Sequence, residues 1–445
     1  MRTRITVKSE DGDNIEKLEA IYRRIDWRLL PFLLLCYVLA CLDRYNISFA
    51  KFQMQQALGM DEAVYGFGAG IFFLGYMLFE VPSNLILERI GARKTISRIM
   101  VLWGVTSASM LFVHNSTSFY VLRFLLGVFE AGFAPGMIFY LTYWYPDTRR
   151  ARVMSIVLMG GPLAGLLGGP LASLIMGALD QARGLAGWQW LFVVEGLPCI
   201  LLGAVTIFYL ADTPAQATWL SKDDRAALAN DIQAVRPRTR HHSLGAVVKD
   251  PWFYMLAFGY FCLICGVYTV SFWLPTMLKS SGVSNGALGW YAGIPYLATV
   301  LLVPVLARHS DRTGERRLHS GIPAILGACL VLLASTFEHD LIRTLLCMSG
   351  ATVSIYVAYV VFWSIPTAYL KATAAAGGIA LLNTIGLFGG FVSPFLIGWL
   401  KNTTGSIQSG LYVMSAILFF GALSILCNRA ATIMIRRSDT VSTSA

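Results

Sequence analysis

The chain has 445 residues, of which 56% are hydrophobic and 13% are charged, and its formal net charge is +10 at pH 7. A soluble domain carries about 25% charged residues, so this composition excludes an ordinary soluble protein and indicates a chain that crosses a membrane repeatedly. The positive charge could suggest nucleic acid, but the basic residues alternate from loop to loop. Since that alternation is a topology pattern, we expect no nucleic-acid partner.

Hydropathy predicts about twelve apolar spans, six on each side of a polar segment. The first six are expected at about 29–48, 64–87, 96–113, 117–141, 153–178 and 190–210. The polar segment 211–250 is predicted to be a linker with one short amphipathic helix near 222–235. The last six are expected at about 251–274, 287–306, 320–336, 341–368, 373–400 and 410–429.

This order predicts an all-α polytopic membrane protein with two six-helix bundles, at 29–210 and 251–430. A cytoplasmic central loop, 211–250, would join them, and cytoplasmic tails are expected at 1–28 and 431–445. Two equivalent halves of this kind are a transporter architecture.

The orientation follows from the basic residues. About 28 of the 35 Lys and Arg fall in the tails, the central loop and the even-numbered loops. About five fall in the odd-numbered loops: Lys51, Arg183, Lys279, Arg343 and Lys401. By the positive-inside rule both termini face the cytoplasm, and we expect an integral plasma membrane protein, in a bacterium the inner membrane.

A short motif repeats after the second and eighth spans. Residues 88–94 and 311–317 both read acid-Arg-x-Gly-x-basic-basic. The glycine allows a tight turn, and the acid can accept from helix N-terminal amides or pair with arginines of the next helix. We expect gating loops there, formed by Glu88, Arg89, Gly91 and Arg93 and by Asp311, Arg312, Gly314 and Arg316.

This loop resembles the signature of the major facilitator superfamily, Gly-x-Leu-x-Asp-Arg-x-Gly-Arg-Arg/Lys. In the first copy Asn84 stands in place of the first glycine and Glu88 in place of the aspartate. In the second copy Ala307 replaces the glycine, while Asp311 and Gly314 fit.

Charges inside the spans are concentrated in the first half. A charge at the bilayer centre costs about 3 kcal/mol or more, so it needs a partner or a water-filled cavity. The second half has no comparable group within its spans, so we expect the first bundle to hold the charge chemistry and the second to set selectivity. The embedded residues are Asp43, Arg44, Glu80, Arg123, Glu130 and Glu195.

Counting residues at about 1.5 Å each places Arg44 and Arg123 at a similar depth, with Glu130 about 10 Å deeper. Two cations at one depth can bind a carboxylate, and an adjacent acid that takes up a proton would couple binding to proton entry. The alternative is inert scaffolding, in which Asp43 pairs with Arg123 and Glu130 with Arg44.

These residues also lie in motifs that resemble the anion:cation symporter family, over about residues 23–429. The resemblance implies proton-coupled import of organic anions such as sugar acids, tartrate or phthalate. It also implies anion binding by Arg44 and Arg123 and proton coupling by Asp43 and Glu130. The matching stretches are DRYN at 43–46, FEVPSN at 79–84, RFLLGVFEAG at 123–132, GWQWLFVVEG at 187–196, the loop 310–317 and GFVSPFLIGW at 390–399.

Three further residues are candidate substrate contacts: Tyr76, Trp363 and Asn383. A hydroxylated substrate would use Asn383 and an aromatic acid would stack on Trp363, although an aromatic at helical spacing is more often packing. Glu80 is expected to pair or cap near the inner gate, and Glu195 to be structural. The glycines of span five, from Gly160 to Gly169, are typical of close helix contact that permits rocking.

We therefore expect a monomeric importer of a small organic carboxylate, working by proton symport with alternating access. We expect no cofactor, no metal and no enzymatic activity, since all six histidines fall in loops or near span ends. The alternative is a drug:proton exporter, but Gly161-Pro162 is followed by LAGLLGG, which does not match the exporter pattern Gly-Pro-x-x-Gly-Gly. A passive channel or receptor is disfavoured by the repeat and the buried acids.

Overall fold

The computed structural model describes residues 10–234, 247, 249–337, 339–369 and 373–428, and within them the regular elements are all helices. Twelve helical segments in these ranges are long and apolar enough to cross a membrane, which confirms the predicted number of spans. The predicted tail 431–445 lies outside the described residues.

The first bundle contains the spans that precede the linker. Its long first helix begins within the predicted tail, so that span is longer than hydropathy indicated. The third span continues beyond α3 in a 3-10 turn, Ser109–Phe112. The helices are α1 (Glu10–Leu58), α2 (Glu62–Ile90), α3 (Ala92–Ala108), α4 (Ser116–Glu130), α5 (Phe133–Trp144), α6 (Asp147–Leu158), α7 (Gly160–Ala178) and α8 (Gly187–Tyr209).

The linker holds α9 (Lys222–Ala234), which confirms the short helix predicted there. The second bundle follows it. Its tenth span is divided between a long and a short helix. The helices are α11 (Pro251–Ser280), α12 (Asn285–Thr313), α13 (Arg317–Ser335), α14 (Leu341–Phe362), α15 (Ser364–Tyr369), α16 (Thr373–Thr404) and α17 (Ile407–Cys427).

The fourth span is broken, and the break lies at Gly132 rather than at Pro135. Gly132 has φ 84°, and a β-carbon built there would lie 2.6 Å from Ser83 Oγ, so only glycine fits. Pro135 lies in the first turn of α5, where its missing N–H has no helical partner to lose. The break ends α4 directly at Glu130, the acid of the predicted site.

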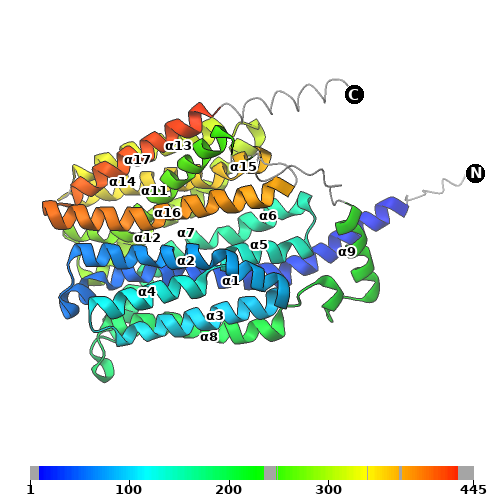
Figure 1. The fold of residues 1–445 in the computed structure, drawn as a ribbon, viewed down its shortest axis with the longest axis horizontal. Helices are drawn as coiled ribbons and strands as arrows, with labels where there is room; N and C mark the ends of the chain where they lie inside the picture. The colour runs from blue at the N-terminus through cyan, green and yellow to red at the C-terminus, as the bar shows by residue number, and fades with distance from the viewer. Residues whose placement is uncertain (1–9, 235–246, 248, 338, 370–372, 429–445) are drawn as a thin grey trace, which may run out of the picture.

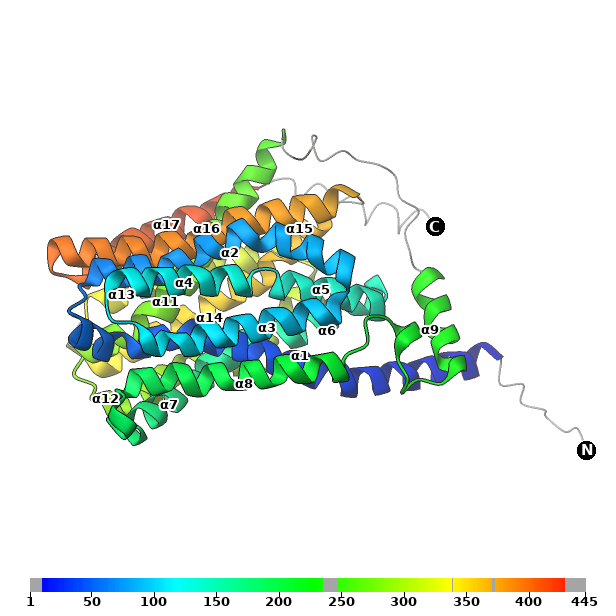
Figure 2. The same ribbon diagram turned by 60° about the horizontal axis from the view of Figure 1, so that its bottom comes forward.

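The two bundles lie side by side with their helices roughly parallel (Figures 1 and 2). Within the bundles α3 packs against α8 and α2 against α4, and α13 packs against both α14 and α17. Between the bundles, α2 packs against α16 and α7 against α12. The start of α1, the end of α17 and α9 lie at one end, which we call the terminus end; the opposite end is the distal end (Figure 1).

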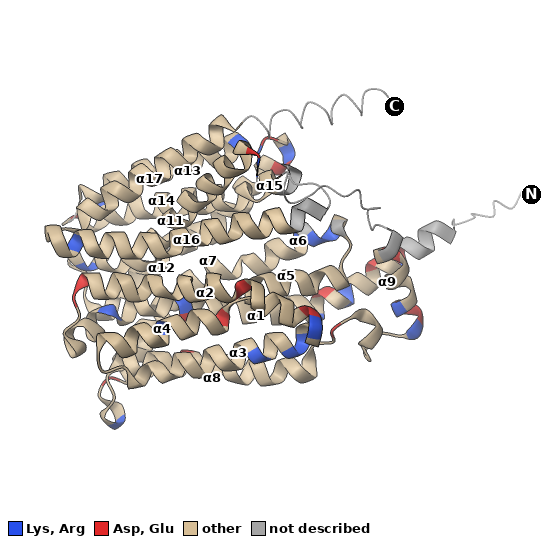
Figure 3. Ribbon diagram, in the orientation of Figure 1, with Lys and Arg blue, Asp and Glu red and all other residues tan. Residues whose placement is uncertain are grey.

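The surface of both bundles is apolar where it would meet lipid. Large hydrophobic side chains stand exposed on the outer helices, among them Leu78, Phe208, Leu301, Leu346 and Phe420. An exposed apolar surface of this extent is unfavourable in water, so it supports a bilayer as the solvent of these helices. Charged residues gather around α9, the α2–α3 connection and the start of α6 (Figure 3).

Candidate substrate and proton site

Arg44 and Glu130 form an ion pair where the first bundle meets the second. Arg44 Nη2 donates to Glu130 Oε1, and Arg44 Nη1 donates to the hydroxyl of Tyr268 on α11 at 3.0 Å. Glu130 is 1% exposed and Arg44 is 14% exposed. One guanidinium therefore connects an acid of the first bundle to a tyrosine of the second.

This pair corrects the depth estimate, which separated Glu130 from Arg44 by about 10 Å. Counting residues compares only the depths of the two backbones, and the long arginine side chain reaches across the difference. The scaffolding alternative predicted this ion pair between Arg44 and Glu130. The ring of Tyr76 lies 5.7 Å from the Arg44 guanidinium, so a predicted substrate residue does border this charge.

Arg123 is fully buried and is bound by backbone rather than by an acid. Its Nε donates to the carbonyl of Gly68 at 3.2 Å and its Nη2 to that of Ala69 at 3.4 Å. Its guanidinium carbon lies 5.2 Å from the centre of the Phe72 ring, the same separation as for Arg44. The two arginines thus share one phenyl ring, while Nη1 of Arg123 has no hydrogen-bond partner among the described residues.

Asp43 is fully buried and does not pair with Arg123. Its Oδ1 accepts from Ser107 Oγ and, at 3.2 Å, from Asn46 Nδ2, both within the first bundle. Glu195 is buried beside this group. The described part of the chain therefore has no Asp43–Arg123 ion pair. Of the two pairings in the scaffolding alternative, only that of Glu130 with Arg44 is present.

Asn383 meets the first bundle at a second carboxylate, and Trp363 packs against its partner Tyr260. Asn383 Nδ2 donates to Glu80 Oε1 at 3.0 Å, and the Tyr260 hydroxyl donates to Asn383 Oδ1 at 3.3 Å. Trp363 packs edge-on against Tyr260, with ring centres 4.9 Å apart. Glu80 thus makes a contact between the bundles, in agreement with a pairing role.

Other buried tyrosines form further hydrogen bonds. The hydroxyls of Tyr45 and Tyr356 lie 3.3 Å apart across the bundle interface, and Tyr296 donates to Ser271 at 3.2 Å. Tyr45 was missed in the sequence, although it directly follows Asp43 and Arg44. The described buried charges of the long helices all lie in the first bundle, so the second offers mainly hydroxyl and aromatic groups.

A third charged group closes the distal end. Lys51 Nζ lies 2.8 Å from Glu62 Oε2, and Lys401 Nζ lies 2.6 Å from Glu62 Oε1. Lys51 also donates to Thr276 Oγ1 at 2.9 Å, and its ammonium lies 4.3 Å from the centre of the Trp273 ring. These five residues, which we call the distal cluster, join α1 and α2 to α11 and α16.

The assignment of Lys51 to an outer loop is therefore wrong. Lys51 lies inside α1 and is fully buried, whereas the loop begins after Leu58. Hydropathy ended the first span at the polar residues that follow Arg44, but the helix continues. The signal was available: Lys51 follows Arg44 by seven residues, about two turns, so both project from one face of the helix.

In the first repeated loop the turn is as predicted, but a different acid caps the next helix. Gly91 has φ 90°, and Asp212 of the linker accepts from the backbone N–H of Arg93 at 2.7 Å. Asp212 Oδ2 also lies 3.9 Å from Arg93 Nε. Glu88 and Arg89 are exposed.

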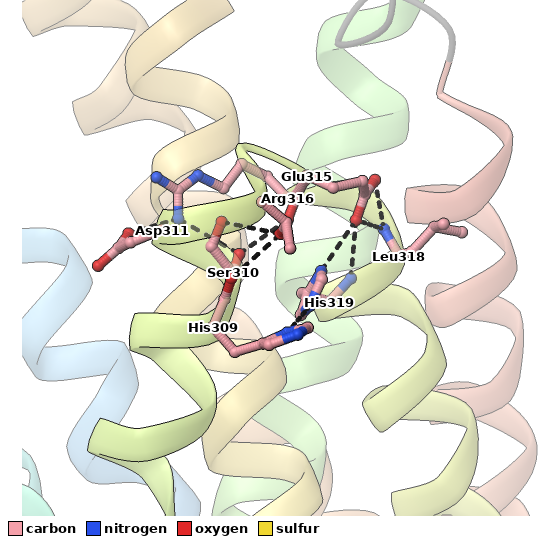
Figure 4. Close-up of polar contacts among 8 residues, drawn as sticks. His309, Ser310, Asp311, Glu315, Arg316, Leu318 and His319 are labelled. Carbon is pink, nitrogen blue, oxygen red and sulfur yellow. Dashed lines mark hydrogen bonds and ion pairs between the residues drawn. The ribbon is translucent and has the colours of Figure 1, made fainter.

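In the second loop (Figure 4), Gly314 has φ 68°, and Asp311 lies 2.5 Å from Arg316 Nη1. Glu315, not Asp311, caps α13, since it accepts from the backbone N–H of Leu318 at 2.8 Å. Partial burial acts to raise the pKa of the Glu315 carboxyl, but the amides of Leu318 and His319 and the His319 ring outweigh it, so the pKa is lowered. Arg312 is exposed.

Two bundles of apolar spans, with buried charges in the first bundle at its contacts with the second, are typical of a membrane transporter. The family description "Major Facilitator Superfamily" matches residues 33–394. The chain belongs to the major facilitator superfamily.

Its relatives support the resemblance to the anion:cation symporters. The chain is 43% identical over 427 residues to a candidate tartrate transporter of Agrobacterium vitis, covering 94% of this chain and 93% of that protein. A second such protein of the same species is 44% identical over 416 residues, covering 91% and 94%. A quinolone resistance transporter of Acinetobacter baumannii is 38% identical over 407 residues, covering 91% and 93%.

Among solved structures, the chain is similar to a bacterial homologue of the human lysosomal transporter Spinster in an inward-facing, unoccupied conformation. The TM-score is 0.72 and the identity 16%, and the match covers 94% of this chain and 98% of the other. This similarity shows the fold alone.

Proposed function

We propose that the protein imports a small organic carboxylate together with a proton. The observation that supports this most is that Arg44, a cation facing the second bundle, is occupied by an internal carboxylate, that of Glu130. In the proposed cycle, a substrate carboxylate that binds Arg44 replaces Glu130 as its partner.

The exchange supplies the coupling. A carboxylate released from its cation inside the protein would be left charged and desolvated, which is costly. A proton on Glu130 removes that cost and frees Arg44 for the substrate. Proton and anion therefore bind together, and Asp43, buried in the same bundle, is the second proposed proton site.

Alternating access would then depend on contacts between the bundles. By the positive-inside rule the distal end faces outward and the terminus end faces the cytoplasm. The distal cluster must separate for the outward-open state, and the Glu80–Asn383 hydrogen bond, nearer the terminus end of α2, must separate for the inward-open state.

For the substrate class we propose hydroxylated carboxylates of the tartrate or sugar-acid kind, with aromatic acids as the second choice. The hydroxyls of Tyr268 and Tyr356 and the amide of Asn383 can hydrogen-bond a hydroxylated anion. The names of the two Agrobacterium relatives favour the same choice.

The test is the pH of lightly buffered, de-energised cells that express the protein, to which sugar acids, tartrate and aromatic carboxylates are added one at a time. We expect one compound to alkalinise the medium through the native protein. Glu130→Gln should abolish this signal while it still exchanges labelled internal substrate, because the amide is already neutral. The matched control, Asp223→Asn on the exposed face of α9, should behave as the native protein.

The drug-exporter alternative retains one specific observation, the 38% identical quinolone resistance transporter. Energised cells loaded with a quinolone separate the two functions. Efflux through the native protein, with no alkalinisation by any carboxylate, would replace the importer with the exporter.

A further inference from the structure

An open hollow lies outside the central site, where α1 and α8 reach the terminus end. It has a volume of about 470 Å³ and is lined by Arg23, Arg24, Trp27, Arg28, Tyr209 and Trp219. The apolar part of the first span begins at Leu29, and Tyr209 is the last residue of α8. The hollow is therefore at the level where the hydrocarbon of a bilayer gives way to the headgroups.

The hollow presents two cations without an acid. The Arg28 guanidinium lies 4.8 Å from the ring centre of Tyr209 and 5.0 Å from that of Trp219, and its Nε is buried without a hydrogen-bond partner. Arg23 is exposed and forms no ion pair within the described part of the chain. Arg24, by contrast, is bound to Asp224 at 3.0 Å.

The other nearby acids are already engaged. Asp26 accepts from the Tyr145 hydroxyl at 2.7 Å, and Glu19 is paired with Arg149. The positive charge of Arg23 and Arg28 is thus not cancelled by a partner of their own. The cation–π contacts with Tyr209 and Trp219 also restrict where the Arg28 guanidinium can lie.

Trp27 adds an apolar surface beside these cations. Its side chain is 77% exposed, an unusual position for tryptophan in water. At a membrane interface the same position is favourable, because the indole lies among headgroups and glycerol backbones. The hollow therefore combines a cationic part with an apolar part at one depth.

We propose that this hollow binds an anionic glycerophospholipid, with the headgroup phosphate on Arg23 and Arg28 and the glycerol and upper acyl chains against Trp27. A soluble phosphate would share the cationic contact but would not require the exposed indole. The proposal depends on the chain spanning a membrane and is independent of the transported substrate.

The test is native mass spectrometry of the full chain, released from micelles that contain equal amounts of phosphatidylglycerol and phosphatidylcholine. The native protein should retain phosphatidylglycerol preferentially. Arg23→Gln with Arg28→Gln should weaken that retention by about fivefold for each cation removed. The matched control is Lys222→Gln, an exposed basic residue on nearby α9 that does not line the hollow, and it should retain the lipid as the native protein does.

A second variant guards against misfolding of the double variant. Trp27→Ala removes a side chain that is almost entirely exposed, so it should leave the fold intact and still weaken lipid retention several-fold. Unchanged retention in both Trp27→Ala and Arg23→Gln would overturn the proposal. If inorganic phosphate displaces phosphatidylglycerol from the native protein, the ligand is soluble phosphate and the lipid assignment is wrong.

Discussion

The two buried arginines of the first bundle differ in their hydrogen-bond partners. Arg44 has a carboxylate and a tyrosine from the other bundle, whereas Arg123 has two backbone carbonyls of α2. An ion pair can be exchanged for a substrate, but carbonyls that belong to the helix cannot leave. Arg44 is therefore the stronger candidate for direct contact with the anion, and Arg123 can act through Phe72, which both arginines contact.

Replacement of Arg123 tests this distinction. Arg123→Ala should reduce uptake to background, since it removes a buried cation and two hydrogen bonds from a charged donor, each contributing about 1.5–3 kcal/mol. Arg123→Lys keeps the charge but lacks the planar fork, so we expect partial uptake with an unchanged pH response. Uptake at native rates in Arg123→Ala would remove this residue from the site.

At this scale the sequence revealed which residues are buried charges, because each interrupts an apolar span. It did not reveal their partners. Depth along a helix locates a backbone atom, whereas Arg44 reaches Glu130 with a side chain several ångströms long. Lys51 was assigned to a loop for a different reason. Hydropathy ends a span at polar residues even where they are buried between two bundles.

At the scale of helices and loops, the repeated motif twice places a glycine with positive φ between two helices, but the backbone angles of the two glycines differ. Gly91 adopts φ 90° and ψ 161°, a region that only glycine occupies readily. Gly314 adopts φ 68° and ψ −4°, near the left-handed region that other residues tolerate at a cost. A β-carbon at Gly91 would also lie 2.7 Å from Asp212 Oδ1, whereas a β-carbon at Gly314 would have no other atom within 4 Å.

Alanine at the two positions should therefore have unequal effects. Gly314→Ala should lower stability by about 1–2 kcal/mol, the cost of a left-handed alanine. Gly91→Ala should cost more, since it also displaces the acid that caps α3. Thermal unfolding of the two purified variants measures the difference, and equal midpoints would show that Asp212 does not depend on this turn.

The spans themselves were predictable because twelve long apolar segments are a strong signal. The break at Gly132 was not, since a sliding average of hydropathy does not respond to the backbone angle of one glycine. The capping acids were also missed: Asp212 lies in the linker, far from its helix in sequence, and Glu315 occupies a position where the motif has no fixed residue.

Over the whole molecule, the distal cluster contributes an ion pair between the bundles, that of Lys401 with Glu62. Glu62→Gln removes the carboxylate shared by Lys51 and Lys401, so it should weaken distal closure by about 2 kcal/mol, roughly a 30-fold change in the open population. Spin labels at Gln56→Cys and Ser284→Cys, on exposed distal positions of the two bundles, should move apart, in a background that lacks the exposed Cys329 and Cys427.

The control for this measurement is Arg343→Gln. Arg343 forms an ion pair with Asp340 at the same end of the molecule, but both residues belong to the second bundle. Its loss should leave the label distance unchanged. Identical distances in Glu62→Gln and the native protein would mean that the Glu62 carboxylate does not hold the distal end closed.

Close backbone contact offers an independent test of the same closure. Gly169 on α7 meets Gly289 on α12, and a β-carbon at Gly169 would lie 2.3 Å from the Gly289 carbonyl oxygen. Gly169→Ala should therefore prevent full approach of the bundles and reduce uptake at least about tenfold. Gly177→Ala, on the same helix with nothing within 4 Å, should transport normally, and equal rates for both variants would contradict the argument.

The Arg44–Glu130 pair has an electrical consequence. In the proposed cycle the empty site is neutral, and after exchange it holds a protonated Glu130 and a substrate anion on Arg44. For a monocarboxylate this step moves one negative and one positive charge together, so membrane voltage exerts no net force on it. The charge that crosses the membrane per substrate molecule would then equal the number of additional protons, those carried by Asp43 or by a second acid.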